Sequence, residues 1–384
     1  MELSPETIAA ANGVAEDKAY GAVVPPLYLS STYEFTGFDE HRGYDYSRAT
    51  NPTRDQLSDT INRLEGGAGA VITSSGMAAI DLVLTVLKPD DLLIAPHDCY
   101  GGTLRLLSAR AAQDHFRLAL VDQTREETVV AALEERPALV LLETPSNPLM
   151  RITDIGMVSA RARAVGAKVV VDNTFLSPAL QRPIALGAHV VVHSTTKYLN
   201  GHSDVVGGAV VAADADMVEH FKAWANMTGV TGAPFDAFLT LRGLRTLFPR
   251  IEYQQRNATA VAEYLATHKM VDAVHYPGLP SHPGHAIAAR QQRGFGAMLS
   301  FEIAGDPQGV RRFVERVRVF TLAESLGGVE SLVAHPATMT HASLSPDALR
   351  AAGIGHNLLR LSVGLENQSD LISDLEGALA AMRT

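Results

Sequence analysis

The sequence predicts an α/β fold with a large, mostly parallel sheet, and two observations carry this prediction. From about Glu65 onward, short apolar runs alternate with stretches of helical spacing. These runs cover residues 70–73, 92–95, 139–142, 168–171, 190–192 and 209–211. Because they do not alternate with polar residues, they are typical of strands covered on both faces. Beyond about Arg250, a helix precedes shorter alternating stretches such as 297–303 and 358–363, which predicts a smaller α+β domain.

The chain is long enough for more than one domain. Its 384 residues, of which 46% are hydrophobic, can bury a large core and exceed the usual size of one compact domain. The first 60 residues are rich in Pro, Ser, Thr and Tyr and do not resemble a self-standing domain. We therefore expect an N-terminal arm over 1–60 that packs against another body, a large domain over 61–250 and a small C-terminal domain over 251–384.

Charge and cysteine content disfavour several classes of protein. The formal net charge is −10, whereas nucleic acid and anionic membranes are bound by basic surfaces, so neither is expected as a partner. The single cysteine, Cys99, cannot form an internal disulfide and is expected to be a small buried side chain. The first residues lack the pattern of a signal peptide, and Asp81 or Lys88 interrupts the longest apolar stretches. We expect a cytoplasmic protein without a membrane span.

Lys197 and Asp172 are the most informative residues of the chain. Each follows an apolar run, and the hydroxyls of Ser194 and Thr196 lie beside Lys197. Because the carboxyl ends of parallel strands meet at one edge of a sheet, the amine and the carboxylate can reach one ring. Pyridoxal 5'-phosphate (PLP) requires an amine that forms a Schiff base and a carboxylate that keeps the pyridine nitrogen protonated. A surface lysine and a loop-capping aspartate are the ordinary alternatives, but together the two residues predict a PLP site.

Two glycine-containing segments could approach such a cofactor closely. The segment Ser75-Gly76-Met77 follows a predicted strand and opens a predicted helix, where free backbone N–H groups can bind a phosphate. An ordinary capped helix is the alternative. Tyr100 precedes Gly101-Gly102, so the backbone could approach a flat ring and the phenol could stack on it. A surface turn with a packing tyrosine is the alternative there.

Arg360 is a candidate for binding a substrate carboxylate. It lies in an alternating apolar stretch, where an unpaired charge would be costly, so a bidentate partner is implied. The substrate α-carboxylate and an internal Asp or Glu fit this requirement equally well, and both remain open. In the arm, the segment 44–54 carries two phenols and two guanidiniums, with a polar linker as the alternative. No metal site is expected, because the histidines lack metal-binding spacing.

Eight segments together resemble one known family. They are 24–26 (VPP), 44–54 (YDYSRATNPTR), 75–77 (SGM), 96–102 (PHDCYGG), 143–148 (ETPSNP), 171–178 (VDNTFLSP), 193–205 (HSTTKYLNGHSDV) and 321–332 (TLAESLGGVESL). The chain resembles the Cys/Met-metabolism family of PLP-dependent enzymes, from about Tyr20 to the last predicted helix. The resemblance implies a fold-type-I PLP-dependent transferase, similar to aspartate aminotransferase, with pyridoxal 5'-phosphate as its cofactor.

The resemblance also implies roles in cofactor binding. Lys197 would be the Schiff-base lysine and proton shuttle, Asp172 the partner of the pyridinium nitrogen and Tyr100 the ring-stacking phenol. The residues implied to hold the phosphate are Gly76, Met77, Ser194 and Thr196. Tyr46 and Arg48 are implied to reach the phosphate of a neighbouring subunit. This predicts a dimer with shared active sites and, by the same resemblance, a homotetramer built as a dimer of dimers.

Substrate-binding residues are implied in the same way. Those implied to surround the carboxylate of the substrate amino acid are Asn147, Ser325 and Arg360. Those implied to lie near the distal end of a γ-substituted substrate are Glu324, Asp45 and Asn226. Ala49 departs from the family pattern, because related enzymes can carry a second arginine there that would favour an anionic succinyl group. Arg105 could serve that purpose instead.

The implied reaction is a γ-replacement in which O-succinyl-L-homoserine and L-cysteine give L-cystathionine and succinate. The expected partners are thus small amino-acid substrates. Alternatives with the same fold are a lyase that splits cystathionine and a sulfhydrylase that uses sulfide. A non-enzymatic nucleotide-binding α/β protein is an alternative of another class, but the chain lacks Gly-x-Gly-x-x-Gly after its early strands, which disfavours it.

Overall fold

The structure is a computed structural model that describes residues 3–305, 307–342, 349–350 and 352–382. Contacts within the chain divide it into two compact units. The first unit combines Met1–Lys88 with Lys168–Phe248, and the second combines Pro89–Ala167 with Pro249–Thr384. Each unit is therefore built from two stretches that are far apart in the sequence. None of the helices within the described residues is both long and apolar enough to cross a membrane.

The first unit contributes four strands to the large sheet. In spatial order they are β1 (Gly69–Thr73), β7 (Gly208–Ala212), β6 (Val190–Ser194) and β5 (Lys168–Asp172). β5 and β6 are parallel, with Asp172 opposite Val192, whereas β7 is antiparallel to both β6 and β1. The helices of this unit are α1 (Pro5–Ala11), α2 (Pro52–Glu65), α3 (Gly76–Leu84), α7 (Ser177–Leu180), the 3-10 helix η1 (Pro183–Leu186), α8 (Ala215–Thr228) and α9 (Pro234–Leu244). The valines of β5 and β6 are fully buried, so both strands belong to the core.

Helix α2 has clear start and stop signals. Asn51 is its N-cap, and the side-chain Oδ1 accepts hydrogen bonds from the N–H groups of Thr53 (3.0 Å) and Arg54 (3.3 Å). Pro52 follows at the first helical position. The helix ends at Glu65, because Gly66 adopts the left-handed conformation with φ +78°. These signals place the Glu65 side chain at the last turn of α2, where it is completely buried.

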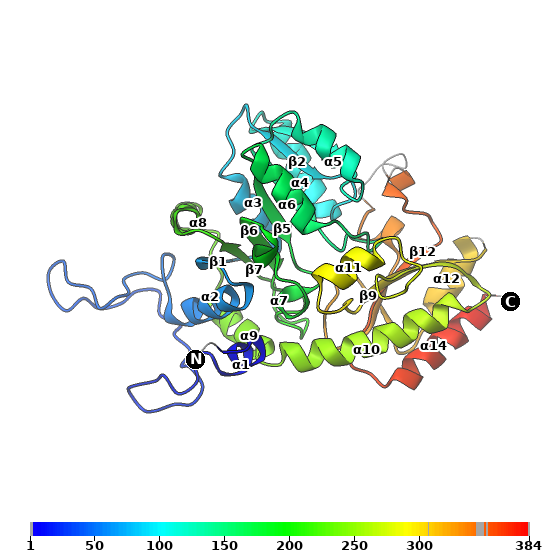
Figure 1. The fold of residues 1–384 in the computed structure, drawn as a ribbon. Coiled ribbons are helices and arrows are strands. Elements are labelled where there is room, and N and C mark those ends of the chain that lie inside the picture. Colours follow the sequence, from blue (N-terminus) through cyan, green and yellow to red (C-terminus); the bar gives the residue numbers. More distant parts are fainter. Residues whose placement is uncertain (1–2, 306, 343–348, 351, 383–384) are drawn as a thin grey trace. The chain divides into compact units, whose positions relative to one another are not determined.

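The segment between α1 and α2 contains neither a helix nor a strand. Two isolated bridges, Thr32 to Tyr46 and Gly37 to Glu40, are its β-type pairings. Large apolar side chains of this segment, such as Tyr20 and Phe38, are almost completely exposed. Figure 1 shows the segment as long blue loops that project away from α2. The predicted division of the chain at residues 60 and 250 remains a prediction.

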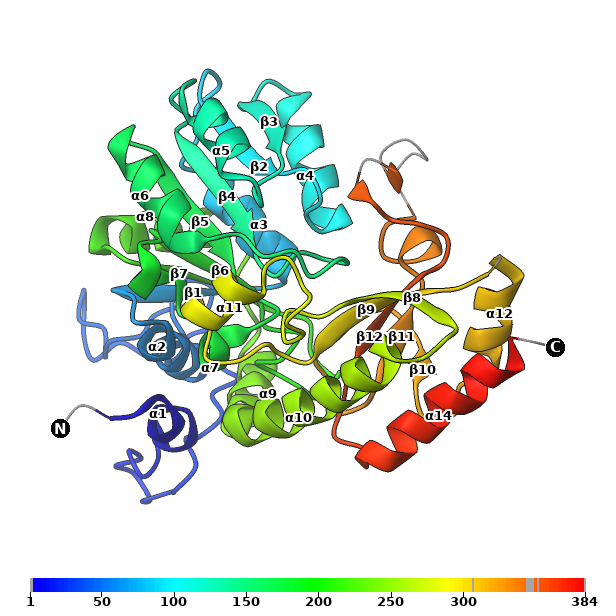
Figure 2. The same ribbon diagram turned by 45° about the vertical axis from the view of Figure 1, so that its right-hand side comes forward.

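The second unit contains the other three strands of the large sheet and a separate five-stranded sheet. In the large sheet, β2 (Leu92–Pro96) is parallel to both β3 (Arg117–Val121) and β4 (Leu139–Glu143). The smaller sheet has the order β10 (Thr321–Leu322), β11 (Leu332–Ala334), β12 (Leu358–Ser362), β9 (Met298–Ile303) and β8 (Val271–His275). The helices are α4 (Gly101–Ala111), α5 (Glu126–Leu133), α6 (Ile155–Ala164), most of α10 (Leu247–Ala266), α11 (His285–Gln291), α12 (Pro307–Arg316), the 3-10 helix η2 (Pro336–Thr338) and α14 (Gln368–Ala381). Helix α12 packs against α14 (Figure 2).

The predicted fold class is confirmed. The fold is α/β, with a large, mostly parallel sheet and a smaller α+β part that follows in the sequence. All six apolar runs that predict strands coincide with β1, β2, β4, β5, β6 and β7. β3 was not predicted, because its side chains are exposed or only partly buried and do not form an apolar run. The antiparallel direction of β7 was not predicted either, because the order of strands depends on long-range packing.

Candidate active site

Two strand ends meet in the first unit and bring Asp172 and Ser194 to the same edge of the sheet. Asp172 is the last residue of β5, and Ser194 is the last residue of the parallel strand β6. Thr174 connects them: its N–H donates to Asp172 Oδ1 (3.0 Å), and its hydroxyl accepts from the Ser194 N–H (2.9 Å). The role of Thr174 was not predicted from the sequence, although a Thr two residues after a strand-end Asp is typical of an Asx turn.

The charge of Asp172 is incompletely compensated by the protein. Desolvation raises the pKa of Asp172, and this effect outweighs the hydrogen bonds from Thr174 and the positive charge of His193, which lower it. A cationic group placed beside this carboxylate would lower the pKa again. The protonated ring nitrogen of PLP is such a group, so the chemistry of Asp172 fits the predicted cofactor.

The start of α3 lies against Ser194. Ser75 caps the helix, and its hydroxyl accepts from the Ala78 N–H (3.0 Å). A Cβ atom added to Gly76 would lie 2.7 Å from Ser194 Cβ, so only glycine allows α3 to approach β6 this closely. Within the described part of the chain, the N–H groups of Gly76 and Met77 have no acceptor. They are therefore free to donate to a phosphate, and the helix dipole favours an anion there.

Lys197 lies in the turn that directly follows β6. Its N–H donates to the Ser194 carbonyl (3.3 Å), and its own carbonyl accepts from the Gly201 N–H (2.7 Å). The lysine residue is partly buried. The Thr196 hydroxyl is hydrogen-bonded to both the N–H (3.0 Å) and the carbonyl (3.3 Å) of Gly207. The first unit therefore brings together Asp172, Ser194, Thr196, Lys197, Gly76 and Met77, which we call the Asp172 cluster.

A second cluster lies in the second unit around Arg360. This residue belongs to β12 and is only 2% exposed. Its Nη1 donates to Asn147 Oδ1 (2.8 Å), and its Nη2 donates to the carbonyl of Ser325 (2.9 Å). Ser325 has φ +105°, an uncommon conformation for a residue with a side chain. We call Arg360, Asn147 and Ser325 the Arg360 cluster; their hydrogen bonds fix the plane of the guanidinium.

Glu143 extends this cluster to Tyr100. Its Oε2 accepts from the Tyr100 N–H (2.9 Å), and its Oε1 accepts from the Asn147 N–H (3.1 Å). Tyr100 precedes α4, and a Cβ atom on Gly102 would lie 2.5 Å from the phenol ring, so a side chain there would displace the phenol. No role of Glu143 was predicted from the sequence. The signal available was its place at the end of the buried strand β4.

His341 lies beside Arg360 and was also missed. It is 1% exposed, and its Nδ1 is hydrogen-bonded to the Thr340 hydroxyl (2.9 Å). Burial, together with the positive charge of Arg360, lowers the pKa of His341 to about 4, so the imidazole is neutral at neutral pH. Its Nε2 has no hydrogen-bond partner among the described residues. No sequence pattern distinguishes this histidine from the others.

Four predicted residues form a separate group in the first unit. Arg48 Nε donates to Asn226 Oδ1 (3.0 Å), and the Arg48 guanidinium lies 5.5 Å from the centre of the Tyr46 ring. The Tyr46 N–H donates to Asp45 Oδ1 (2.6 Å). Asp45, Tyr46 and Arg48 are exposed on the N-terminal segment. In the second unit, Glu324 and Arg105 are exposed.

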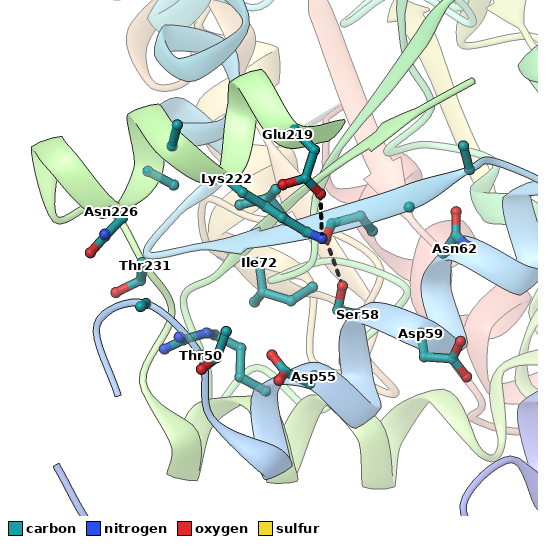
Figure 3. A pocket seen from close by; sticks show the side chains of 18 residues that line it. Thr50, Asp55, Ser58, Asp59, Asn62, Ile72, Glu219, Lys222, Asn226 and Thr231 are labelled. Atoms are coloured by element: carbon teal, nitrogen blue, oxygen red, sulfur yellow. Dashed lines mark hydrogen bonds and ion pairs between the residues drawn. The ribbon is translucent and has the colours of Figure 1, made fainter. Parts of the chain in front are cut away.

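A cavity of about 530 Å³ lies between α2, β1 and α8 of the first unit (Figure 3). Of the predicted site residues, Asn226 alone lines it. Lys222 forms an ion pair with Glu219 (3.0 Å) at this cavity. Desolvation raises the pKa of Asp55, another lining residue. The described part of the chain has no group of three or more His, Cys, Asp or Glu side chains that could hold a metal ion.

The fold and the two clusters define a PLP-dependent enzyme. Residues 6–380 match the model of the family described as Cys/Met metabolism PLP-dependent enzyme, and the chain belongs to this family. Pyridoxal phosphate is therefore its cofactor. The non-enzymatic alternative is wrong, because family membership identifies an enzyme.

The chain is similar to particular members over its whole length. It is 59% identical to cystathionine gamma-synthase of Escherichia coli K12, over 99% of both chains. A crystal structure of cystathionine gamma synthase from Xanthomonas oryzae pv. oryzae in complex with cystathionine is 57% identical, with a TM-score of 0.99 over 100% of this chain and 99% of that one. A cystathionine beta-lyase of Lactococcus lactis subsp. cremoris is 46% identical over 96% of both chains.

Proposed function

We propose that this chain catalyses the reaction of a cystathionine γ-synthase, the transsulfuration step of methionine biosynthesis. O-succinyl-L-homoserine and L-cysteine give L-cystathionine and succinate. The observation that carries the proposal is the full-length identity to the E. coli synthase, which exceeds the identity to the L. lactis lyase. Departure of succinate from Cγ and addition of the cysteine sulfur to the same carbon make the reaction a transfer.

The residues of the Asp172 cluster have distinct tasks in this proposal. PLP, when bound, supplies an electron sink that stabilises negative charge at the substrate Cα. Asp172 holds a negative charge against the ring nitrogen, and Gly76, Met77, Ser194 and Thr196 hold the phosphate. The Lys197 amine binds the cofactor and then moves protons between Cα and Cβ of the substrate.

The Arg360 cluster binds the amino-acid part of the substrate. Asn147 and Ser325 orient the guanidinium of Arg360, whose planar fork matches a carboxylate. Tyr100 stacks on the cofactor ring and accepts a proton from the incoming amine or thiol. Residues proposed near the distal end of the substrate are Glu324, Arg105, Asp45 and Asn226. Arg105 supplies the cation that Ala49 does not, which favours succinyl as the acyl group.

The N-terminal segment supports a proposed subunit arrangement. Its large apolar side chains, including Tyr20 and Phe38, are almost completely exposed in the single chain. Because exposed apolar surface is typical of a protein–protein interface, this favours contact with a second copy of the chain. In this arrangement residues 1–60 form the arm, 61–250 the PLP-binding domain and 251–384 the small domain. Tyr46 and Arg48 reach the phosphate of the neighbouring subunit. The enzyme is proposed to be a cytoplasmic homotetramer, a dimer of dimers.

Mixing two inactive variants tests the shared site. Arg48→Ala and Lys197→Ala subunits should each be inactive, and exchange should restore activity, because one site of the mixed dimer carries neither change. Subunit exchange is verified with differently tagged copies. If exchanged dimers recover no activity, the sites are not shared between subunits.

Substrate pairing tests the reaction. The purified protein is given O-succinyl-L-homoserine with and without L-cysteine, and in a parallel sample L-cystathionine alone. The proposal expects cystathionine and succinate only when both substrates are present. The alternatives are cystathionine γ-lyase and an O-acylhomoserine sulfhydrylase of the same fold, and similarity to a solved cystathionine gamma-lyase from Lactobacillus plantarum supports the first of them. Cleavage of cystathionine to cysteine and 2-oxobutyrate without any synthesis would establish the γ-lyase. A further sample contains O-succinyl-L-homoserine and sulfide, and a product formed there but not with L-cysteine would establish the sulfhydrylase.

A further inference from the structure

Three buried polar side chains lie on one face of the small sheet in the second unit. β9 and β12 are antiparallel neighbours (Figure 2), and Arg360 of β12 is directly opposite Ser300 of β9. Directly opposite residues point to the same face of a sheet, and so do residues two apart on one strand, which places Ser362 on this face as well. All three side chains are buried. We call Ser300, Arg360 and Ser362 the polar row.

One part of the polar row holds the segment that carries Asn147. The Ser300 hydroxyl donates to the carbonyl of Pro148, the residue that follows Asn147 (2.6 Å). Arg360 Nη1 donates to Oδ1 of Asn147 itself (2.8 Å). The main chain and the side chain of this segment are thus both attached to the same face of the sheet.

Another part of the polar row holds the loop that carries Ser325. The Gly327 N–H donates to the hydroxyl oxygen of Ser362 (2.8 Å). Helix α10 holds the next residue, because the completely buried Gln254 donates from Nε2 to the carbonyl of Gly328 (2.7 Å). Both hydrogen bonds lie within three residues of Ser325, so they restrict the position of its main chain.

The backbone of Ser325 requires such support. Its φ of +105° is uncommon for a residue with a side chain, and conformations of this kind persist only where the surrounding structure imposes them. They also occur preferentially where a ligand is bound. The carbonyl of Ser325 accepts from Arg360 Nη2 (2.9 Å), so the strained residue directly orients the guanidinium.

We propose that Ser300 and Ser362 are positioning residues for the amino-acid part of the substrate. Ser300 fixes the segment of Asn147 and Ser362 fixes the loop of Ser325, so both acceptors of the Arg360 guanidinium stay in place before a substrate arrives. A guanidinium that is already oriented binds a carboxylate at a lower cost in conformational entropy. The inference rests on the proposed role of Arg360 in binding the substrate carboxylate, and it adds two residues that act through Arg360.

Ser300→Ala and Ser362→Ala each remove one hydroxyl and no charge. We expect KM for O-succinyl-L-homoserine to rise about fivefold in each, the effect of one lost hydrogen bond. The turnover number should change less than about twofold, because the carboxylate is bound alike before and during the chemical step.

A pair of ligands that differ only in the carboxylate gives a second readout. The dissociation constants of L-norvaline and L-norvalinamide are measured on the holoenzyme through the change in visible absorption of the bound cofactor. The preference for the carboxylate over the carboxamide should fall about fivefold in both serine variants, since the guanidinium is less well oriented. This measurement does not depend on which of the candidate reactions the enzyme catalyses.

Ser159→Ala is the matched control. Ser159 of α6 is also buried, but its hydroxyl has no hydrogen-bond partner among the described residues, so this variant should keep both the KM and the preference for the carboxylate. If both serine variants of the polar row behave like Ser159→Ala, the proposal is overturned. Equal weakening of L-norvaline and L-norvalinamide would also overturn it, because a general loosening of the site would then explain the effect.

A second variant tests the loop if Ser362→Ala does not fold. Gln254→Met removes the hydrogen bond to Gly328 with a side chain of similar size, and the side-chain oxygen that it deletes has no partner among the described residues. This variant should show the same loss of preference for the carboxylate. An unchanged preference in folded Gln254→Met would contradict the need to hold this loop.

Arg360→Ala separates the inference from the proposed function. If Arg360 does not bind the substrate carboxylate, this variant still prefers L-norvaline to L-norvalinamide as strongly as the wild type, and the assignment of Arg360 fails. If Arg360→Ala loses the preference while Ser300→Ala and Ser362→Ala behave like Ser159→Ala, the assignment stands and only the positioning role of the two serines fails.

Discussion

The Asp172 cluster and the Arg360 cluster contain buried side chains of opposite charge. In the first, desolvation outweighs the hydrogen bonds to a carboxylate, and its pKa is raised. In the second, the amide oxygen of Asn147 and the carbonyl of Ser325 fix a buried guanidinium, and these two acceptors carry no formal charge. The first cluster thus favours a cationic ring, and the second favours an anionic carboxylate. The difference shows that each cluster is matched to a ligand of opposite charge.

The largest expected effect concerns the amine of the Asp172 cluster. Lys197→Ala should fold normally and lose at least about a thousandfold in turnover, because no other proposed group moves protons between Cα and Cβ of the substrate. Cystathionine formation and the visible band of the bound cofactor measure the effect. Lys168→Ala, at the exposed first position of β5, is the matched control and should retain activity. If Lys197→Ala kept its turnover, Lys197 would not be the residue that moves the substrate protons.

The Arg360 cluster is tested by a change that keeps its charge. Arg360→Lys retains a cation but cannot make both bonds, to Asn147 and to Ser325, in one plane. We expect kcat/KM for the homoserine ester to fall about 50-fold, mainly through KM, because a charged hydrogen bond is lost. Exposed Arg293→Lys should have no such effect. Unchanged kinetics in Arg360→Lys would mean that charge alone, and not geometry, matters there.

A smaller effect is expected at the start of α3. In Gly76→Ala the added methyl group would lie 2.7 Å from Ser194 Cβ, so the helix must move away from β6. We expect PLP affinity to weaken about tenfold, in the range of overpacking costs. Gly377→Ala in α14 is the control, because nothing lies within 4 Å of its added Cβ, and it should be neutral or slightly stabilising. If the two variants bound PLP equally well, binding of the phosphate would not require the close approach of α3 to β6.

The smallest effect concerns His341 and acid stability. Its pKa of about 4 in the folded chain lies below the ordinary value of 6.5, so the unfolded chain binds the proton first. The stability contributed by the neutral imidazole is complete above pH 6.5 and is lost as the pH falls toward 4. Between pH 7 and pH 5, the apparent melting temperature of His341→Gln should therefore fall by about 3 °C less than that of the wild type. His115→Gln, an exposed histidine, should follow the wild type; identical acid sensitivity of all three proteins would contradict the prediction.

The two clusters also differ in how far the sequence predicts them. Asp172, Ser194 and Lys197 follow apolar runs that predict parallel strands, and the ends of such strands converge by geometry alone. Asn147, Ser325 and Arg360 lie far apart in the sequence, so nothing short of the resemblance to a family groups them. Their roles, like those of Tyr46 and Arg48, remain predictions.

Several residues whose side chains bind the main chain were not predicted from the sequence. The Thr174 hydroxyl and the Glu143 carboxylate accept hydrogen bonds from main-chain N–H groups, and this use of a side chain leaves little pattern in a single sequence. Glu65 is similar: a glutamate at the end of a helix normally faces solvent, and only the packing of α2 shows that this one is buried.

The shared carboxylate of Glu143 has a consequence for protein engineering. One oxygen holds the main chain at Tyr100 and the other holds it at Asn147, so a displacement in either loop changes the position of the other. Substitutions in the two loops are therefore expected to be non-additive. Directed-evolution libraries that aim at a new amino-acid donor should vary both loops in combination, since single-site screens would discard pairs that work only together.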